Sequence, residues 1–320
     1  MIVSCGEALI DFVPAQTAAG EASYVPHPGG SPFNVAVTVG RLGVSAGFLG
    51  SISTDFFGTR LIDALHRSSV DTRYVTRLDR PSILAFVDLS GTEPRYAFYD
   101  QGAAPRFWAP GGDLSADVTV LHLAFGALLP VDDPFGANFA SLFAANKGRR
   151  VLTLDPNVRQ NVVAGREGAY RERLAALVEL ADLVKISTAD LAWLEPARTP
   201  AAVAERWLAN GTALVVVTAG GDGATAYARG GRNVHQAAQP IDLVDTVGAG
   251  DSFMGALLVG LEGAGVMSPT DLADIDDAGI SSALGFAVHV SAITCSRAGA
   301  DPPWRYEVTL PVQSSAKGIR

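Results

Sequence analysis

Cysteine and positive charge are both scarce in this chain of 320 residues. Its two cysteines, Cys5 and Cys295, lie far apart, and neither belongs to a CxxC pair or a Cys/His cluster, so neither a disulfide framework nor a zinc site is expected. The 24 basic residues are outnumbered by 33 acidic ones, and a net charge of -9 argues against a nucleic acid or an anionic membrane as the main partner. These absences favour a protein of the reducing cytoplasm.

Long uninterrupted hydrophobic runs are also missing. The apolar N-terminal stretch contains Glu7 and Asp11 and has no basic region before it, which predicts a strand rather than a signal peptide. His122 and Pro130 interrupt the apolar run at residues 118–131, so no segment is expected to cross a membrane. With 48% hydrophobic residues, the chain has ample material for a core, and a soluble protein is predicted.

Short apolar segments alternate with amphipathic segments along most of the chain. Such alternation is typical of an α/β protein with a mainly parallel central sheet flanked by helices, and we expect one main domain. Strands are predicted at residues 2–13, 46–52, 118–125, 151–154, 183–186, 213–218 and 225–229, and helices at residues 32–42, 56–66, 134–146, 167–181, 249–261 and 271–289.

Two segments, residues 12–27 and 83–100, interrupt this alternation. Within the second, residues 83–89 and 95–99 resemble antiparallel strands around a Ser90-Gly91-Thr92 turn. We expect both segments to form a small β lid on the main domain. Exposed edges of lid strands attract a pairing partner, which predicts a homodimer formed through the lid.

The run DTVGAGDSFMGALL, residues 245–258, is a turn of small residues that opens into a helix. Gly248, Ala249 and Gly250 leave their backbone N–H groups accessible, and the helix dipole favours negative charge, so a phosphate is expected there. The charge of Asp251 opposes phosphate binding, and its presence is explained if it takes a proton during a reaction. A plain helix cap, with the acid complementing the dipole, is the alternative.

A second glycine-rich turn, GGSPFN at residues 29–34, also opens into a predicted helix. It lacks the GxGxxG spacing of a dinucleotide site, and Pro32 removes an N–H donor, which disfavours an oxidoreductase. Its glycines and the Asn34 amide suit close approach to a polyol. Together with residues 50–58, this turn resembles the first signature of the PfkB (ribokinase-like) carbohydrate kinases, and residues 245–258 resemble the second.

The resemblance implies a ribokinase-like three-layer α/β fold with a β lid, and transfer of the γ-phosphate of ATP to a primary hydroxyl of a sugar. Asp251 is then expected to accept the hydroxyl proton, while the amides of residues 248–250 stabilise the developing charge. Closure of the lid would exclude water. The implied sugar ligands are Asp11, at the end of the first predicted strand, with Gly29, Gly30 and Asn34.

The segment Asp155-Pro156-Asn157-Val158-Arg159 follows another predicted strand. Its turn leaves Arg159 projecting, and a similar segment lines the substrate and phosphate region in family members that act on fructose and keto-deoxy sugar acids. Asn157 and Arg159 are therefore expected to bind substrate, as is Phe98 of the lid. For both Asp155 and Arg159, a surface ion pair is the alternative.

Two further segments resemble the family's nucleotide and metal region. In the family, a Thr-x-Gly-x-x-Gly segment in this place contacts ATP, and Thr218, Gly220 and Gly223 keep its spacing. Without the resemblance, the stretch predicts only a hairpin. Residues 185–190 occupy the place of the family's Asn-x-x-Glu motif, so they are expected to handle phosphate and magnesium. The members implied are Lys185 and Ser187 for the nucleotide and Asp190 for Mg²⁺.

The second of these segments departs from the family motif. Asp190 is one methylene shorter than the motif's glutamate, so its contact with Mg²⁺ is expected to run through water. A helix cap formed by Ser187 and Asp190 explains the same residues without a metal. Residues 294–300, with Asp245, resemble a loop that surrounds a monovalent cation in the family, which implies potassium activation.

The predicted acceptor is fructose, because residues 96–100, His122, residues 155–159 and residues 294–297 together resemble bacterial fructokinases. A 2-keto-3-deoxygluconate kinase is the nearest alternative, although its acidic acceptor needs positive charge that Asp100 opposes. A ribokinase or nucleoside kinase is a further alternative. A non-catalytic sugar- or nucleotide-sensing module would not need Asp251. A serine hydrolase is disfavoured, because no GxSxG motif surrounds Ser252.

Overall fold

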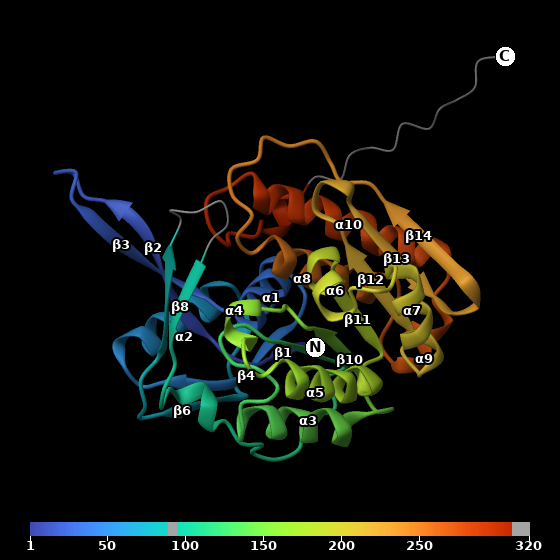
Figure 1. The fold of residues 1–320 in the computed structure, drawn as a ribbon, viewed down its shortest axis with the longest axis horizontal. Coiled ribbons are helices and arrows are strands. Elements are labelled where there is room, and N and C mark those ends of the chain that lie inside the picture. The colour runs from blue at the N-terminus through green and yellow to red at the C-terminus, as the bar shows by residue number, and fades with distance from the viewer. Residues whose placement is uncertain (89–94, 309–320) are drawn as a thin grey trace.

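The computed structural model describes residues 1–88 and 95–308, and its strands form two sheets of unequal size (Figure 1). The main sheet has ten strands, in the order β14-β13-β12-β11-β10-β9-β1-β4-β5, with β6 pairing to β4. Its strands are β1 (Ile2–Cys5), β4 (Ala46–Ser53), β5 (Val70–Asp71), β6 (Val75–Leu78), β9 (Val120–Ala124), β10 (Val151–Asp155), β11 (Leu183–Ser187), β12 (Leu214–Thr218), β13 (Ala224–Ala228) and β14 (Arg232–Gln236).

Strand pairing in the main sheet is parallel except at β13 and β14, which pair antiparallel. The central strands β1, β9 and β10 are buried at every position, as expected when helices cover both faces of a parallel sheet. The carboxyl ends of the parallel strands therefore meet at one edge of the sheet, where open α/β folds gather ligands.

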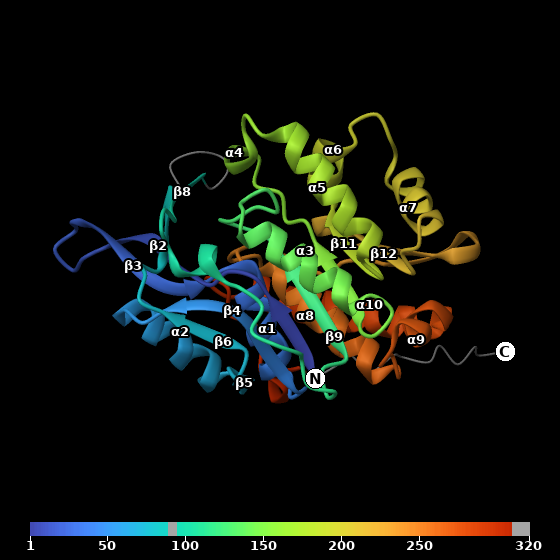
Figure 2. The ribbon, with the colours of Figure 1, turned by 90° about the horizontal axis from the view of Figure 1, so that it is seen from below.

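Helices cover both faces of the main sheet, which gives the three layers that the sequence predicts (Figure 2). One layer contains α1, α2, α8, α9 and α10, and the other contains α3, α5, α6 and α7, with a separate hydrophobic core on each face. The helices are α1 (Ser31–Arg41), α2 (Phe56–Arg67), α3 (Phe135–Asn146), α4 (Gln160–Val163), α5 (Glu167–Leu180), α6 (Thr188–Leu194), α7 (Pro200–Ala209), α8 (Ala249–Gly263), α9 (Pro269–Asp274) and α10 (Asp277–Cys295). The predicted fold class is confirmed.

The lid sheet has the order β3-β2-β7-β8 and extends from one side of the main body (Figure 1). The strands β2 and β3 form a hairpin, and β7 and β8 pair antiparallel as predicted. The predicted Ser90-Gly91-Thr92 turn lies outside the described residues. The lid strands are β2 (Leu9–Gln16), β3 (Ala22–Gly29), β7 (Ile83–Asp88) and β8 (Arg95–Tyr99).

The prediction of one continuous strand at residues 2–13 is wrong. Gly6, with φ of 141°, breaks it into β1 of the main sheet and β2 of the lid sheet. A Cβ at Gly6 would lie 2.7 Å from Pro32 Cγ, so a side chain has no room at this crossing. Asp11 consequently belongs to β2 of the lid sheet and not to the first strand of the main sheet.

The prediction of one helix at residues 271–289 is also wrong. The chain leaves helical geometry at Ile275, and Asp276 then caps α10 by accepting a hydrogen bond from Gly279 N at 2.7 Å. At 19 residues, α10 is long and apolar enough to cross a membrane, which the sequence reading missed. It packs against α8, β13 and β14, as a core helix of the main body does.

Candidate active site

Two cavities meet at the start of α8, and both are lined by Thr246 and Gly250. The first, about 200 Å³, is called the polar cavity, and the second, about 370 Å³, is called the apolar cavity. The polar cavity lies between the lid sheet and the main body. Its lining includes Asp11, Gly30, Ser31, Asn34, Tyr96, Phe98, Ala127, Asn157, Arg159, Gly248 and Asp251.

Asp251 lies in the first turn of α8 and faces the polar cavity. Its two carboxylate oxygens accept hydrogen bonds from Ser31 Oγ at 2.6 Å and from Asn34 Nδ2 at 2.9 Å. Burial raises the pKa of Asp251, and these two hydrogen bonds oppose the increase. Because each oxygen keeps a free lone pair, Asp251 can accept one more hydrogen bond from a ligand hydroxyl.

The turn before α8 provides an anion site beside Asp251. Gly248 has φ of 75°, and a Cβ there would lie 2.6 Å from Ala300 Cβ, so only glycine fits. A Cβ on Gly250 would lie 3.0 Å from Lys185 Nζ, which brings an ammonium group to the start of the helix. Ala249 N donates to the Thr246 carbonyl oxygen at 3.2 Å, so the N–H groups of Gly248 and Gly250, the helix dipole and this ammonium together favour negative charge.

Lys185 forms a buried ion pair with Asp155, with Nζ 2.8 Å from the carboxylate. Burial alone would lower the pKa of Lys185, but the Asp155 carboxylate outweighs it, and the lysine pKa is raised. Asp155 therefore forms an ion pair, but a buried one and not the surface ion pair that the sequence left as its alternative. It holds the lysine charged at the start of α8.

Asp11 enters the polar cavity from β2 of the lid sheet. A Cβ on Gly29 would lie 2.2 Å from Asp11 Oδ2, so the glycine makes room for the carboxylate. Gly30, with φ of 105°, lets the chain turn into α1. Burial raises the pKa of Asp11 to about 7, the charge of Asp251 adds to the increase, and Arg159 opposes it.

The opposite wall of the polar cavity comes from residues 157 and 159. Asn157 has φ of 41° and donates from Nδ2 to the carbonyl oxygen of Phe125 at 2.7 Å, which fixes its amide. Arg159 has no carboxylate partner among the described residues and contacts the carbonyl oxygens of Asn157 and Val158 at 3.5 and 3.4 Å. Its guanidinium can therefore bind a ligand oxygen. Phe98 and Tyr96, stacked 5.8 Å apart, close the cavity from the lid.

Glu7 lies behind the polar cavity and is completely buried. Its Oε1 accepts a hydrogen bond from Ala127 N at 3.1 Å, and its Oε2 has no partner among the described residues. Burial raises the pKa of Glu7 to about 8. This residue holds Ala127, a wall residue, in position.

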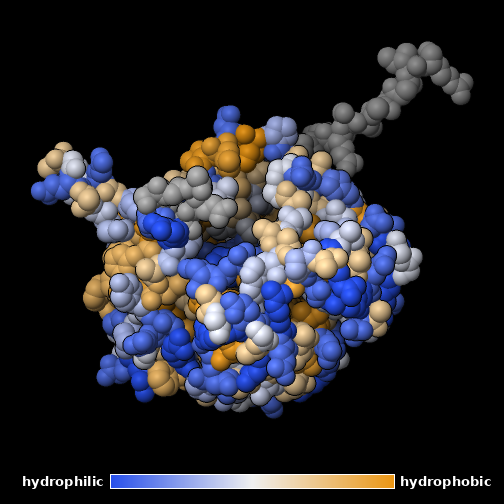
Figure 3. Space-filling model, viewed as in Figure 1, coloured by the Kyte–Doolittle hydropathy of each residue, from blue (hydrophilic) through white to orange (hydrophobic). Residues whose placement is uncertain are grey.

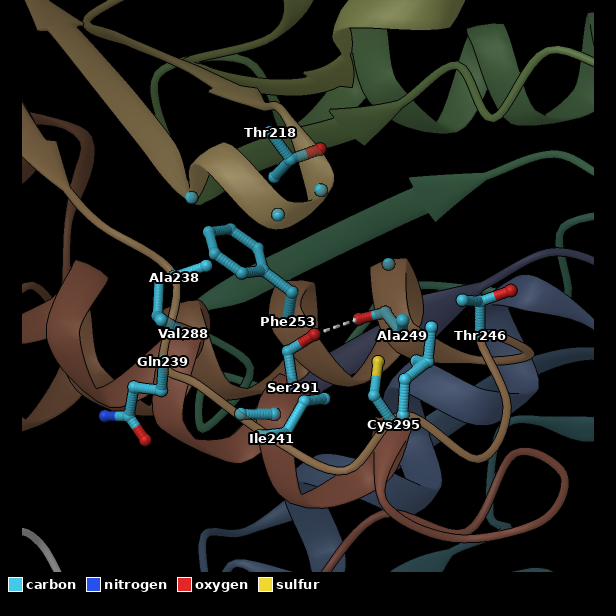
Figure 4. A pocket seen from close by; sticks show the side chains of 16 residues that line it. Thr218, Ala238, Gln239, Ile241, Thr246, Ala249, Phe253, Val288, Ser291 and Cys295 are labelled. Carbon is cyan, nitrogen blue, oxygen red and sulfur yellow. Dashed lines mark hydrogen bonds between the residues drawn. The ribbon is translucent and has the colours of Figure 1, made fainter.

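The apolar cavity is lined by residues of β12, α8 and α10, among them Thr218, Phe253 and Ser291 (Figure 4). The predicted nucleotide residues Thr218, Gly220 and Gly223 line it, at the turn between β12 and β13. No charged side chain lines it within the part of the chain that the structure describes. The sequence reading missed most of its wall, namely Ala238, Gln239, Ile241, Leu243, Phe253, Val288, Ser291, Ala292 and Cys295.

The loop between β14 and α8 forms one rim of the apolar cavity. Ile241, Leu243 and Val244 of this loop are exposed, and Figure 3 shows a hydrophobic patch where Figure 1 draws the loop. Exposed apolar side chains beside an apolar cavity indicate a surface that a flat, partly apolar ligand would cover.

Ser187 and Asp190, predicted for the nucleotide and Mg²⁺, lie at the start of α6 and line neither cavity. Ser187 Oγ accepts a hydrogen bond from Asp190 N at 3.0 Å, so the helix cap is present. Burial and the charge of Asp155 raise the pKa of Asp190. Among the described residues, no group of three His, Cys, Asp or Glu side chains is placed to hold a metal.

Asp245 links two loops beside the anion site. Its Oδ1 accepts from Val247 N at 3.0 Å, and its Oδ2 accepts from Gly299 N at 2.8 Å. The backbone of Cys295 joins the same arrangement by accepting from Val244 N and Asp245 N. Residues 295 and 299 of the predicted cation loop are thus tied to Asp245 by hydrogen bonds from backbone N–H groups, and potassium binding there stays a prediction.

Two residues that were used to predict fructose as the acceptor, His122 and Asp100, do not have the surroundings that this prediction assumed. His122 is buried in β9, where its ring nitrogen Nδ1 lies 2.9 Å from Thr153 Oγ1, and burial lowers its pKa to about 4. It lines neither cavity. Asp100 forms an ion pair with Arg106, so its charge is compensated and does not act as the unopposed repulsion assumed from the sequence.

Comparison with known proteins matches the pfkB family carbohydrate kinase description over residues 1–305. A fructokinase of Rhizobium leguminosarum bv. trifolii is 36% identical over 87% of this chain and 84% of its own length. Fructokinase-1 of Oryza sativa subsp. japonica is 33% identical over 97% and 96%. The crystal structure of a fructokinase with bound ATP from Xylella fastidiosa is 27% identical and superposes with a TM-score of 0.83 over 93% of both chains.

Proposed function

Because this chain belongs to the pfkB family of carbohydrate kinases, we propose that it transfers the γ-phosphate of ATP to the primary hydroxyl of fructose, giving fructose 6-phosphate and ADP. The observation that supports this most strongly is Asp251 at the junction of the two cavities, next to the anion site. The polar cavity is the proposed sugar site. The apolar cavity is the proposed nucleotide site.

In the proposed reaction, Asp251 accepts the proton of the C6 hydroxyl as that oxygen attacks the γ-phosphorus. The bond between the γ-phosphorus and the bridging oxygen breaks, and ADP leaves. The N–H groups of Gly248 and Gly250 and the Lys185 ammonium would stabilise the charge on the transferring group. Ser31 and Asn34 hold the Asp251 carboxylate in place, so little reorganisation is needed.

The sugar would be oriented by Asp11, Asn34, Asn157 and Arg159. An ionised Asp11 accepts hydrogen bonds from sugar hydroxyls, while the Asn157 carbonyl and the Arg159 guanidinium offer complementary acceptors and donors. The aromatic rings of Tyr96 and Phe98 cover the apolar face of the sugar ring. Closure of the lid sheet would exclude water, which competes for the phosphoryl group.

Magnesium is proposed to enter with ATP. The absence of a three-ligand cluster among the described residues is compatible with this, because Mg²⁺ bound by nucleotide phosphates keeps several waters and needs few protein ligands. Asp190 is the proposed outer ligand, through water, and the metal would supply neutralisation of phosphate charge. Potassium beside Asp245 stays a prediction of the family resemblance.

We also propose a cytoplasmic homodimer formed through the lid. Phe12 stacks on Phe86 at 4.7 Å, and Phe86 packs edge-on against Tyr24 and Tyr99, which are 50% and 64% exposed. Neighbouring residues of a strand point to opposite faces, so this cluster lies on the face of the lid away from Asp11. Two such faces would cover each other. Sedimentation velocity of the wild type and of Tyr99→Glu tests the proposal, and a monomeric wild type contradicts it.

The proposed activity is tested by coupled ADP release with fructose, ribose, 2-keto-3-deoxygluconate and adenosine as acceptors. We expect fructose to give the highest kcat/KM and ADP release to require both sugar and Mg²⁺. A higher kcat/KM for any of the other three acceptors contradicts fructose as the substrate. ADP release that is independent of every acceptor contradicts the proposed sugar kinase activity.

A further inference from the structure

A third cavity adjoins the polar cavity beneath the lid and is called the side chamber. It has a volume of about 250 Å³ and shares Tyr96, Phe98 and Ala127 with the polar cavity. Asn161 of α4 forms part of its wall and donates from Nδ2 to the carbonyl oxygen of Tyr96 at 3.2 Å, which ties α4 to the lid. Since Asp251 lies in the polar cavity and not in the side chamber, the side chamber adjoins the part of the sugar remote from the reacting hydroxyl.

Two arginines line the side chamber, and each forms an ion pair with an aspartate. Arg106 pairs with Asp100, donates from Nε to the Asp100 carbonyl oxygen at 3.1 Å, and lies 3.8 Å from Asp132. Arg166 pairs with Asp132 at 2.6 Å, and Asp132 is 8% exposed. Two positive charges and two negative charges leave the chamber with no net charge. Its arginines have hydrogen-bonding edges, but no uncompensated charge for an incoming anion.

We propose that Asp100 determines acceptor specificity by occupying Arg106, so that the side chamber takes the neutral hydroxymethyl end of a ketose and rejects a carboxylate there. A carboxylate entering the chamber would lose its hydration and meet Asp100 and Asp132, while both guanidinium groups are already paired. A hydroxymethyl group has no charge to desolvate and can hydrogen-bond to the edges of the paired ions. Asp100 acts through Arg106 and is therefore a positioning residue.

This inference rests on the proposed function, because it assumes that a ketose occupies the polar cavity. The matched probes are D-fructose and 2-keto-D-gluconate, which differ only in whether C1 is a hydroxymethyl group or a carboxylate. Dissociation constants are measured by isothermal titration calorimetry, which needs no turnover. Thermal unfolding of every variant checks that it is folded.

For the wild type we expect fructose to bind at least tenfold more tightly than 2-keto-D-gluconate. Asp100→Asn frees Arg106 and is expected to reduce this ratio at least tenfold, through tighter binding of the acid, with an effect that weakens at high salt. Asp100→Glu keeps the charge and should leave the ratio within about threefold of the wild type. If Asp100→Asn does not fold, Arg106→Gln provides the opposite test, because an uncompensated Asp100 should increase the ratio.

Asp88→Asn is the matched control, since Asp88 also pairs with a lid arginine, Arg95, and lines none of the three cavities described here. It should leave the ratio unchanged. A wild type that binds both probes equally, an Asp100→Asn ratio equal to that of the wild type, or an equal shift in Asp100→Glu each overturns the inference. Failure of ADP release with fructose contradicts the proposed function instead, and an unchanged ratio with normal ADP release contradicts the inference alone.

Discussion

The polar cavity and the apolar cavity meet at Gly250, yet different kinds of residue build them. Carboxylates, amides and a guanidinium line the polar cavity, and several are held by hydrogen bonds to one another or to the backbone. Most of the residues that line the apolar cavity are glycines or have apolar side chains. Its polar lining residues, Thr218, Gln239, Thr246 and Ser291, are all uncharged, and no charged side chain of the described residues reaches it.

This difference separates two tasks that a phosphoryl-transfer site performs. The polar side must orient a hydroxyl within reach of a base, which requires side chains with fixed geometry. The apolar side needs only to hold a flat group by burial and shape, for which backbone turns and small residues suffice. Substitutions on the two sides should therefore change different kinetic parameters.

Asp251→Asn should produce the largest effect. It removes the proposed proton acceptor while keeping a similar shape, so we expect kcat to fall about a thousandfold or more, with the ATP dissociation constant within about threefold of the wild type. Single-turnover kinetics and calorimetry measure the two quantities. The control is Asp271→Asn, because Asp271 also lies in the first turn of a helix, α9, but lines neither cavity. A kcat near that of the wild type would remove Asp251 from the mechanism.

Asp11→Asn should act on the sugar side alone. We expect the KM for fructose to rise about tenfold to a hundredfold, because a sugar hydroxyl loses a charged acceptor, while the KM for ATP stays unchanged. The pKa of Asp11 is raised to about 7, and sugar hydroxyls bind the ionised form. Wild-type kcat/KM for fructose should therefore fall as pH drops below about 7.

The fall of kcat/KM at acid pH also tests whether Asp11 is the group that titrates there. In Asp11→Asn the fall of kcat/KM near pH 7 should disappear, because the amide that replaces the Asp11 carboxylate does not ionise. A pH profile measured for both proteins decides this. If kcat/KM of the variant falls at the same pH as that of the wild type, another group is responsible for the fall.

Ala292→Phe should act on the nucleotide side alone. Ala292 lines the apolar cavity from α10, and a phenyl ring there fills space that the nucleotide base would occupy. We expect the KM for ATP to rise about tenfold and the fructose dissociation constant to stay unchanged. The control is Ser282→Phe, on the exposed face of the same helix. Weaker fructose binding with unchanged ATP binding would contradict the division between the cavities.

The sequence predicted the polar cavity far better than the apolar one. Four residues of the polar cavity could be predicted because burying a polar or charged side chain is unfavourable unless it has a partner or ligand. They also lie in turns next to predicted strands and helices. These residues are Asp251, Asn34, Asn157 and Arg159. Phe253 and Val288 carry no such signal, since apolar residues at helical spacing predict a core equally well. Only the glycine turn after β12 indicated the second cavity.

Other differences came from contacts that spacing along the chain does not reveal. The break at Gly6 depends on the approach of Pro32, and the pairing of Asp100 depends on the chain bringing Arg106 back beneath the lid. His122 was used to predict the acceptor because of the family resemblance, but it is a buried core residue. The overall α/β order was predictable because strand and helix periods differ.

Glu7→Gln should produce the smallest effect, on stability. The pKa of Glu7 is raised to about 8, so its contribution to stability is present at low pH and is lost as pH rises through about 8. The amide cannot ionise, and the variant should gain about 3 °C or more in Tm at pH 9 relative to the wild type, with little difference at pH 5. Differential scanning calorimetry at both pH values measures this. An equal Tm difference at both pH values would show that ionisation of Glu7 is not involved.

The most direct measurement of the central claim is a crystal structure of Asp251→Asn with fructose and Mg·ATP bound. We expect fructose in the polar cavity, with its C6 hydroxyl within about 3 Å of the amide that replaces the Asp251 carboxylate. This hydroxyl should be directed at the γ-phosphate, and the γ-phosphate should contact the N–H groups of Gly248 and Gly250. The adenine base of ATP would lie in the apolar cavity. Fructose bound elsewhere, or a γ-phosphate away from the start of α8, would contradict the account.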